Sequence, residues 1–269
     1  MDHSKQHSGI NKITLAGLIV TLGIVYGDLG TSPLYVFKAI LAGSNTISEL
    51  LVLGGISCIF WTLTLQTTIK YVLITLRADN HGEGGIFALF ALLKKKSTLI
   101  VIITMIGGSA LLADGVITPA ITVTTAIEGL QIIQPSIPVI PLVLLILASL
   151  FSFQRFGTNI IGKLFGPMML VWFLMLGILG ITQIITLPKV LLALNPYYAI
   201  NLLIEYPSGI LLLGAVFLAT TGAEALYSDL GHCGIKNIRV SWFFVKTMLV
   251  LTYLGQGAWV LNHADTALA

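Results

Sequence analysis

Seven long apolar segments constrain this sequence more than any other feature. A helix rises 1.5 Å per residue, so about 20 apolar residues cross the ~30 Å hydrocarbon core of a bilayer. Only 9% of the 269 residues are charged and 56% are hydrophobic, whereas a soluble domain carries about 25% charged residues. The composition excludes a soluble enzyme, a secreted disulfide scaffold, a disordered chain and a nucleic-acid-binding protein, and it predicts an all-α polytopic membrane protein. The predicted spans are residues 13–40, 49–76, 98–130, 138–154, 161–186, 208–229 and 241–261.

Net charge and cysteine placement indicate neither a polyanionic partner nor a cofactor. The formal net charge is only +3, so no strong field favours nucleic acid. Cys58 lies in an apolar run and Cys233 in a polar loop, which predicts neither a disulfide nor a metal site. We therefore expect membrane lipid as a partner, no nucleic acid and no cofactor.

The spans group into four parts along the chain. Residues 1–12 form a polar cytoplasmic tail, and residues 13–186 hold five spans, which we interpret as a first repeat. A short apolar helix near 82–96, followed by three lysines, is predicted to lie on the cytoplasmic lipid surface within this repeat. Residues 187–207 are broken by prolines and read as an outer loop, and residues 208–269 hold the first two helices of a second, incomplete repeat.

Basic residues favour one orientation. With the N-terminus inside, ten basic residues fall in inner segments and only Lys189 falls in an outer loop. Lys38, Lys70 and Lys246 lie within the span limits, close enough to the ends to reach the headgroups. Seven crossings then place Ala269 outside. The ten inner residues are Lys5, Lys12, Arg77, Lys94, Lys95, Lys96, Arg155, Lys163, Lys236 and Arg239.

Three acidic residues lie deep in predicted spans. Each charge at a bilayer centre costs about 2.5–3.5 kcal/mol on the insertion scale. No basic residue lies comparably deep to pair with Asp28, Asp114 or Glu224. Unpaired intramembrane carboxylates indicate a bound cation, a proton, or both. The alternative is a set of protonated acids bonded to neighbouring helices.

The surroundings of Asp28 predict a broken helix. Gly27 and Gly30 flank the acid, and Pro33 removes a backbone donor and clashes with the preceding turn. Gly30 can adopt a positive φ. Free carbonyls at such a break are tolerated in lipid only where the backbone lines a cavity or coordinates something. A simple proline kink is the alternative.

Asp114 belongs to a stripe of oxygen ligands. Asp114, Thr118 and Thr122 follow one another at four-residue spacing, so they line one face of a helix. The alternative for the threonines is a hydrogen bond from each hydroxyl to the preceding turn of backbone.

The third acid also lies at a predicted break. Thr221 and Gly222 precede Glu224 and suggest a second unwound span. The first and sixth spans would then both be interrupted and both carry an acid, which is the pattern of a five-helix repeat inverted in the membrane. Glu224 is predicted to carry a coupling proton, because hydroxyls surround it and no cation holds it charged. Oxygen-only ligands favour a hard cation, and the acid at Asp28 argues against an anionic substrate.

Four segments resemble the KUP/HAK/KT potassium uptake family, in the family's order. The resemblance covers essentially the whole chain and rests on several matches of nine or more residues. The segments are GDLGTSPLY at 27–35, RADNHGEGGIFAL at 77–89, GGSALLADGVITPAIT at 107–122 and TGAEALYSDLGHCG at 221–234.

The resemblance implies a potassium importer acting as a potassium–proton symporter in the bacterial cytoplasmic (inner) membrane. It also implies an inverted-repeat transporter fold of the LeuT-like, APC type, truncated here after about seven helices. Potassium and protons would be the transported ions, and the chain would not be an enzyme. The implied potassium ligands are Asp28, Tyr35, Asp114, Thr118, Thr122 and Thr221, with Glu224 in the sixth-span site.

Alternatives remain open at this stage. Family members have about twelve spans and a cytoplasmic C-terminal domain, so we expect this chain to be a fragment or to need another polypeptide. A potassium channel is the main rival, although no TVGYG-like filter sequence occurs. An intramembrane enzyme using paired acids is a further rival. A homodimer is also left open.

Overall fold

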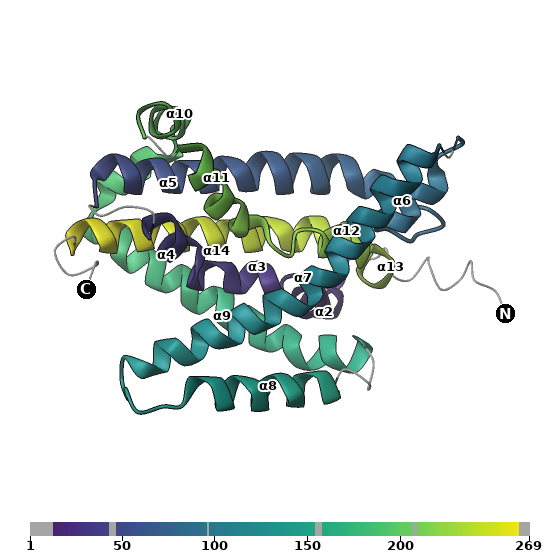
Figure 1. Cartoon of the computed structure of the whole chain (residues 1–269), viewed down its shortest axis with the longest axis horizontal. Coiled ribbons are helices and arrows are strands. Elements are labelled where there is room, and N and C mark those ends of the chain that lie inside the picture. The colour runs from purple at the N-terminus through teal and green to yellow at the C-terminus, as the bar shows by residue number, and fades with distance from the viewer. Residues whose placement is uncertain (1–12, 43–46, 96, 154–157, 207–208, 264–269) are drawn as a thin grey trace. The chain divides into compact units, whose positions relative to one another are not determined.

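The computed structural model describes residues 13–42, 47–95, 97–153, 158–206 and 209–263 (Figure 1). The predicted tail 1–12 lies outside the described residues. The regular structure of the described residues is helical, apart from an isolated antiparallel β-bridge between Asn80 and Glu83. The elements are α2 (Leu15–Val25), α3 (Gly27–Thr31), η1 (Ser32–Leu34), α4 (Val36–Leu41), α5 (Glu49–Thr62), η2 (Leu63–Ile74), η3 (Thr75–Arg77), α6 (Ile86–Leu92), α7 (Thr98–Gln131), α8 (Val139–Phe153), α9 (Thr158–Thr186), η5 (Pro188–Leu194), α10 (Pro196–Glu205), α11 (Gly209–Phe217), η6 (Leu218–Thr220), α12 (Ala225–Ser228), α13 (Leu230–Cys233) and α14 (Ile235–Asn262).

Six of the seven predicted spans have a helical counterpart long and apolar enough to cross a membrane. Five are single stretches, and the sixth is the bent pair Leu15–Val25 and Gly27–Leu34. The prediction of an all-α membrane protein is therefore confirmed. The predicted span 138–154 corresponds to α8, whose 15 residues are fewer than the ~20 of a full crossing. The total number of crossings stays a prediction. The five single stretches are Glu49–Arg77, Thr98–Gln131, Leu164–Thr186, Leu211–Ser228 and Ile235–Asn262.

Hydroxyl side chains fix where three of the spans begin. Thr14 accepts a hydrogen bond from the backbone N–H of the third residue after it, and Ser48 and Ser97 do the same. A hydroxyl at this position satisfies one of the backbone donors left without a partner in the first helical turn. These caps explain why α2, α5 and α7 begin within two residues of the boundaries predicted from hydropathy.

The chain divides into two compact units, and each is built from separate stretches of sequence. Unit 1 comprises Met1–Asp28, Tyr71–Met169 and Gly222–Ser241. Within it, the short helix α6 packs on α7 at Gly107 and Gly108, where an added Cβ would overlap side chains of α6. The hydroxyl of Tyr26 donates to the carbonyl of Ile238 at 2.9 Å. Unit 1 thus joins the end of α2 to the start of α14.

Unit 2 comprises Leu29–Lys70, Leu170–Thr221 and Trp242–Ala269. Its helices approach closely where small residues face one another, as is common between membrane helices. A Cβ on Gly255 would overlap the backbone of Gly180, so α14 and α9 touch backbone to backbone there. The stretch predicted as an outer loop forms η5 and α10 in this unit, and α10 packs on α5.

Candidate functional site

The first broken span is interrupted twice. Helix α2 ends at Val25, the chain bends by 70°, and α3 resumes with Asp28 in its first turn. A short 3₁₀ turn at Pro33 then ends at Tyr35, which has a non-helical backbone. Gly30 lies inside α3 and is not among the described glycines with positive φ, so it does not use the left-handed conformation open to glycine. The bend before α3 and the proline turn interrupt the helix instead.

Side chains of unit 2 bind backbone carbonyls at the second of these interruptions. The indole Nε1 of Trp172 donates to the carbonyl of Gly30 at 2.8 Å. The amide Nε2 of Gln256 donates to the carbonyl of Pro33 at 2.8 Å. The hydroxyls of Ser32 and Tyr35 lie 3.3 Å apart, within hydrogen-bonding reach. The sequence predicted free carbonyls here, and the structure shows which side chains bind two of them.

The second group of predicted ligands lies on α7. The hydroxyl of Thr118 donates to a carboxylate oxygen of Asp114 at 2.9 Å. The Thr118 hydroxyl therefore binds a side chain rather than only the preceding turn of backbone. Thr118 is buried and Thr122, one turn further on, is half-buried. Pro119 is accommodated inside the helix without ending it.

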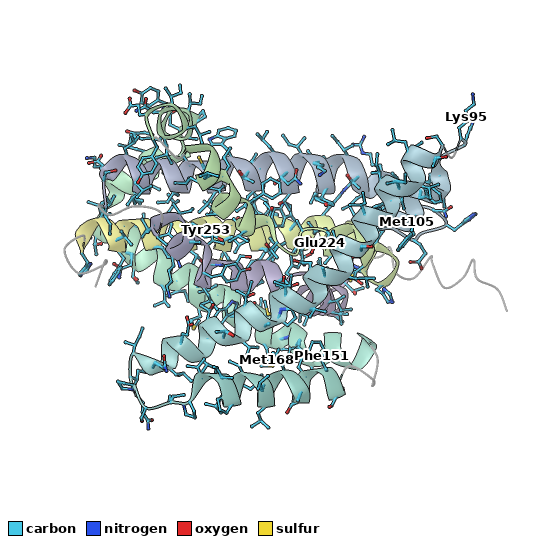
Figure 2. All side chains as sticks on the ribbon, in the orientation of Figure 1. Lys95, Met105, Phe151, Met168, Glu224 and Tyr253 are labelled. Atoms are coloured by element: carbon cyan, nitrogen blue, oxygen red, sulfur yellow. The ribbon has the colours of Figure 1, made fainter. Side chains whose placement is uncertain are left out.

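The sixth span is interrupted at a glycine. Helix α11 continues as a 3₁₀ turn to Thr220, after which Thr221 has a non-helical backbone. Gly222 follows with a φ of 85°, a left-handed conformation that side chains other than glycine rarely adopt. Glu224 is the residue immediately before α12 (Figure 2). The acid thus stands at the point where the helix restarts.

Within unit 1 the three acids lie in electrostatic range of one another. The charges of Asp114 and Asp28 both act on the carboxyl group of Glu224, and the charge of Asp114 also acts on Asp28. The phenol of Tyr71 also lies within electrostatic range of Glu224, and nothing in the sequence had indicated it. Tyr35 and Thr221, the other two predicted ligands considered with these acids, belong to unit 2.

This group of acids is suited to a monovalent cation and a proton. Its ligands are carboxyl and hydroxyl oxygens, which hard cations prefer. Among the described residues, no three His, Cys, Asp or Glu side chains stand close enough to hold a metal ion as a cluster. Within unit 1, the carboxyl groups of Asp28, Asp114 and Glu224 and the hydroxyl of Thr118 supply these oxygens.

A tight loop contacts the segment that follows Glu224. The loop at 78–85 contains a left-handed residue, His81, and two left-handed glycines, and it belongs to one of the four motifs. The hydroxyl of Tyr227 donates to the carbonyl of Ala78. A Cβ on Gly84 would overlap the Tyr227 carbonyl, so the two backbones are in contact. The 77–89 motif thus supports the second broken span.

Lys246 and Cys233 lie in surroundings other than those predicted from the sequence. The ammonium of Lys246 donates to the hydroxyls of Thr64 and Thr68, each at 3.1 Å, and lies 5.6 Å from the ring centroid of Phe60. The prediction that Lys246 reaches the headgroups is therefore wrong. The π-helix η2 presents both threonines, and their hydroxyls accept from the ammonium within unit 2.

Cys233 is buried, although the sequence places it in a polar loop. Its thiol pKa is raised to about 12, mainly by burial; a hydrogen bond with Thr21 lowers it and the nearby Asp229 raises it, and the value includes all three effects. The thiol therefore stays protonated near neutral pH, which makes it a poor nucleophile and a poor metal ligand.

Comparison with known proteins identifies the family. Residues 15–268 match the model of the K+ potassium transporter integral membrane domain. The chain is 63% identical over 265 residues to a probable potassium transport system protein Kup of Cytophaga hutchinsonii, covering 97% of this chain and 40% of that protein. It is 60% identical to the Kup protein of Flavobacterium johnsoniae over 99% of this chain and 40% of that protein. It is 55% identical to that of Enterococcus faecalis over 97% of this chain and 41% of that protein.

The chain therefore belongs to the potassium transporter family, and the KUP/HAK/KT resemblance of the four motifs is confirmed. The names of these relatives describe them as probable potassium transport system proteins. The chain spans about 40% of the length of the first relatives it matches. The comparison with solved structures found no match.

Proposed function

We propose that this chain contains the ion-binding core of a potassium–proton symporter that takes up potassium across the bacterial cytoplasmic membrane. One observation carries the proposal: Asp28, Asp114 and Glu224, from three separate stretches of sequence, interact with one another in unit 1. Buried acids are costly in a membrane unless a cation or a proton neutralises them. A site that binds a potassium ion at one acid and a proton at another neutralises both charges, and the two ions then cross together.

The proposed roles follow the chemistry of each group. Asp28 supplies the charge that attracts the ion, and Asp114 is oriented by the 2.9 Å hydrogen bond from Thr118. Glu224 carries the proton while Asp28 holds the potassium ion, so both are bound together and both leave when the site opens to the inside. The proposed potassium ligands are Asp28, Tyr35, Asp114, Thr118, Thr122 and Thr221, and the proposed proton carrier is Glu224.

The proposed fold is an inverted repeat of the LeuT-like type. Two observations support this fold. The bent span at 15–34 and the broken span at 211–228 each begin a set of helices, and each carries an acid at its interruption. The proposed topology has the N-terminus inside. A single cysteine at Asn80 should then label only from the inside, and one at Ser136 only from the outside. Reversed labelling would reject this topology.

The first experiment measures potassium uptake in cells that lack their own uptake systems. The complete reading frame that encodes this chain is expressed as wild type, Asp28→Asn and the control Glu205→Gln, since Glu205 is exposed at the end of α10. Asp28→Asn should insert normally and abolish uptake, because it removes charge at nearly constant volume. Uptake by Asp28→Asn at the wild-type rate would contradict the proposed role of Asp28.

A second experiment separates the proton from the potassium ion. In vesicles with an imposed proton gradient, Glu224→Gln should lose gradient-driven accumulation of potassium while keeping potassium exchange. A Glu224→Gln variant that still concentrates potassium from a proton gradient alone would reject Glu224 as the proton carrier. Asp114, whose charge acts on Glu224, would then be the next residue to substitute.

A further inference from the structure

Lys246 places an ammonium group near the middle of a membrane span. It lies 11 residues after the start of α14 at Ile235 and 16 residues before its end at Asn262. At the rise of an α-helix, both ends are about 16 Å or more away. A lysine side chain is too short to reach the headgroups from that depth. A charge there is strongly unfavourable unless another group compensates it.

The partners of this ammonium in the described part of the chain are all neutral. Its Nζ donates to the hydroxyls of Thr64 and Thr68, each at 3.1 Å, and lies 5.6 Å from the ring centroid of Phe60. Each hydroxyl donates its own proton to a backbone carbonyl earlier in the same span, at 2.7 and 3.3 Å. Both hydroxyl oxygens therefore accept from the ammonium. These contacts use two of its three N–H donors and leave its charge uncompensated.

Unit 2 offers no acid to Lys246 where it is described. Its described acids are Glu49 and Glu205. Glu49 begins α5, 15 residues before Thr64 and about 20 Å away along the span, and it pairs with Lys189 at 2.7 Å. Glu205 is exposed at the end of α10. Lys246 forms no ion pair with any described residue.

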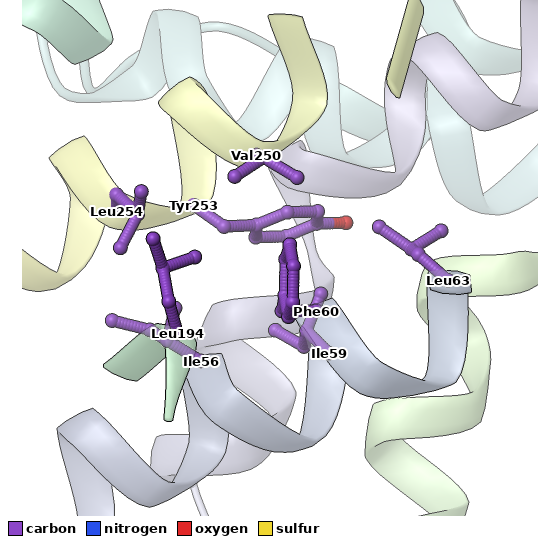
Figure 3. A pocket seen from close by; sticks show the side chains of 8 residues that line it. All are labelled: Ile56, Ile59, Phe60, Leu63, Leu194, Val250, Tyr253 and Leu254. Carbon is purple, nitrogen blue, oxygen red and sulfur yellow. The ribbon is translucent and has the colours of Figure 1, made fainter. Parts of the chain in front are cut away.

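The ammonium is accessible from one side of α14. Phe60 also lines a pocket of unit 2 whose eight side chains carry no charge, so no counter-charge comes from there (Figure 3). Phe243, Lys246 and Thr247 share one face of α14, because they are spaced three and four residues apart. Phe243 is 79% exposed, Thr247 is exposed and Lys246 is half-buried. We call these three residues the Lys246 face.

Charge decides between the molecules that could cover the Lys246 face. Lipid hydrocarbon has no acceptor for the third N–H donor. A second copy docked symmetrically through the same face would bring a second ammonium. A further membrane helix with a carboxylate compensates the charge and accepts from the third donor. The relatives have additional chain for such a helix, since these 269 residues span about 40% of their length.

We propose that the Lys246 face is the docking site of a further membrane helix, from the part of the longer family chain outside these 269 residues, and that an aspartate or glutamate of this helix forms an ion pair with Lys246. The two threonine hydroxyls and the Phe60 ring hold the ammonium in position before the helix docks. The inference concerns the assembly of helices, so it does not depend on potassium binding or proton coupling.

Photo-cross-linking tests what covers the face. The complete reading frame that encodes this chain is expressed with benzoylphenylalanine in place of Phe243, irradiated in the membrane and analysed by mass spectrometry. We expect a cross-link within one polypeptide, to a helix beyond residue 269 that contains an acid. The same replacement of Ile204, which is 76% exposed on α10, is the control for non-specific reaction. Cross-links only to lipid, only to another polypeptide, or to a helix without an acid would overturn the inference.

Thermal unfolding tests the ion pair itself. In the complete protein, Lys246→Met leaves the partner acid without its cation and should lower the melting temperature by about 5 °C or more. Lys246→Arg keeps the charge and should recover part of this loss. In the 269-residue chain, where the partner is absent, Lys246→Met removes an uncompensated charge and should not lower the melting temperature. An equal response of the two proteins to Lys246→Met would show that no acid beyond residue 269 pairs with Lys246.

Discussion

Both broken spans carry an acidic residue at a helix interruption, but different backbone conformations interrupt the two helices. The first is interrupted by a bend before α3 and by a 3₁₀ turn at Pro33, and neither Gly27 nor Gly30 has a left-handed backbone. The second turns at Gly222, which is left-handed with a φ of 85°. The first break is therefore stabilised by side chains that bind its carbonyls, whereas the second depends on one residue type at one position.

This difference predicts opposite sensitivities to substitution. A break held by several distant side chains should tolerate the loss of any one of them at moderate cost. A break that requires a left-handed glycine should tolerate almost no other residue. Four substitutions test this contrast, in order of decreasing expected effect.

Gly222→Ala should have the largest effect. A left-handed conformation costs an L-residue about 1–2 kcal/mol, and relaxing that strain would change the direction in which Glu224 points. We expect a lower melting temperature and loss of uptake. Gly222→Asn is the matched control, because asparagine tolerates this conformation better, and it should recover part of both losses. Equal behaviour of the two variants would show that the backbone conformation of Gly222 is not what matters.

Gly84→Ala should follow, because the added methyl group overlaps the carbonyl of Tyr227. Overpacking of this kind costs about 1–3 kcal/mol, measured as a loss of unfolding free energy. Gly115→Ala is the control, because no atom lies within 4 Å of its added Cβ and alanine favours the helix α7. A Gly84→Ala variant as stable as Gly115→Ala would mean that the loop at 78–85 does not support the second break.

Trp172→Phe should have a smaller effect on the first break. It removes the 2.8 Å hydrogen bond to the Gly30 carbonyl and keeps an aromatic ring. A hydrogen bond of this kind contributes about 0.5–1.5 kcal/mol to stability. Thermal unfolding of the purified variant measures the loss. A loss as large as that of Gly222→Ala would contradict the view that the first break shares its support among several side chains.

Gly27→Ala should have the smallest effect. An added Cβ meets no atom within 4 Å, and the residue is helical. Alanine is favoured over glycine in a helix by about 1 kcal/mol, so the melting temperature should stay the same or rise. A marked fall in melting temperature would show that the first break also needs a flexible glycine, and the contrast between the two breaks would be lost.

The sequence indicated the positions of the acids but not all of their surroundings. Asp28, Asp114 and Glu224 stand out because polar residues are rare in apolar runs, and this signal is local. Trp172 and Gln256, which bind carbonyls of the first break, are 142 and 223 residues from their partners in sequence. Nothing in their own segments indicates those partners, because tertiary packing alone brings them together.

The sequence did not predict the surroundings of Lys246 or the residues at which the first span turns. Lys246 was expected at the membrane surface, since a long side chain near a span end usually reaches water. The π-helix at Leu63–Ile74 instead presents two threonine hydroxyls to it, and no hydropathy pattern predicts a π-helix. At the first break, α3 continues through Gly30, and the chain bends before Gly27 and turns at Pro33 instead. Local composition predicted where the helix is interrupted but not which residue carries the turn.

The central claim is that the acids gathered in unit 1 bind potassium, and infrared difference spectroscopy tests it most directly. Spectra of the purified chain in lipid are recorded while potassium replaces choline. We predict carboxylate bands in the difference spectrum that Asp28→Asn removes or shifts and that Glu205→Gln leaves unchanged. Loss of a protonated-carboxyl band in Glu224→Gln would further assign the proposed proton to Glu224. A difference spectrum without carboxylate bands, or one that Asp28→Asn leaves unchanged, would contradict the claim.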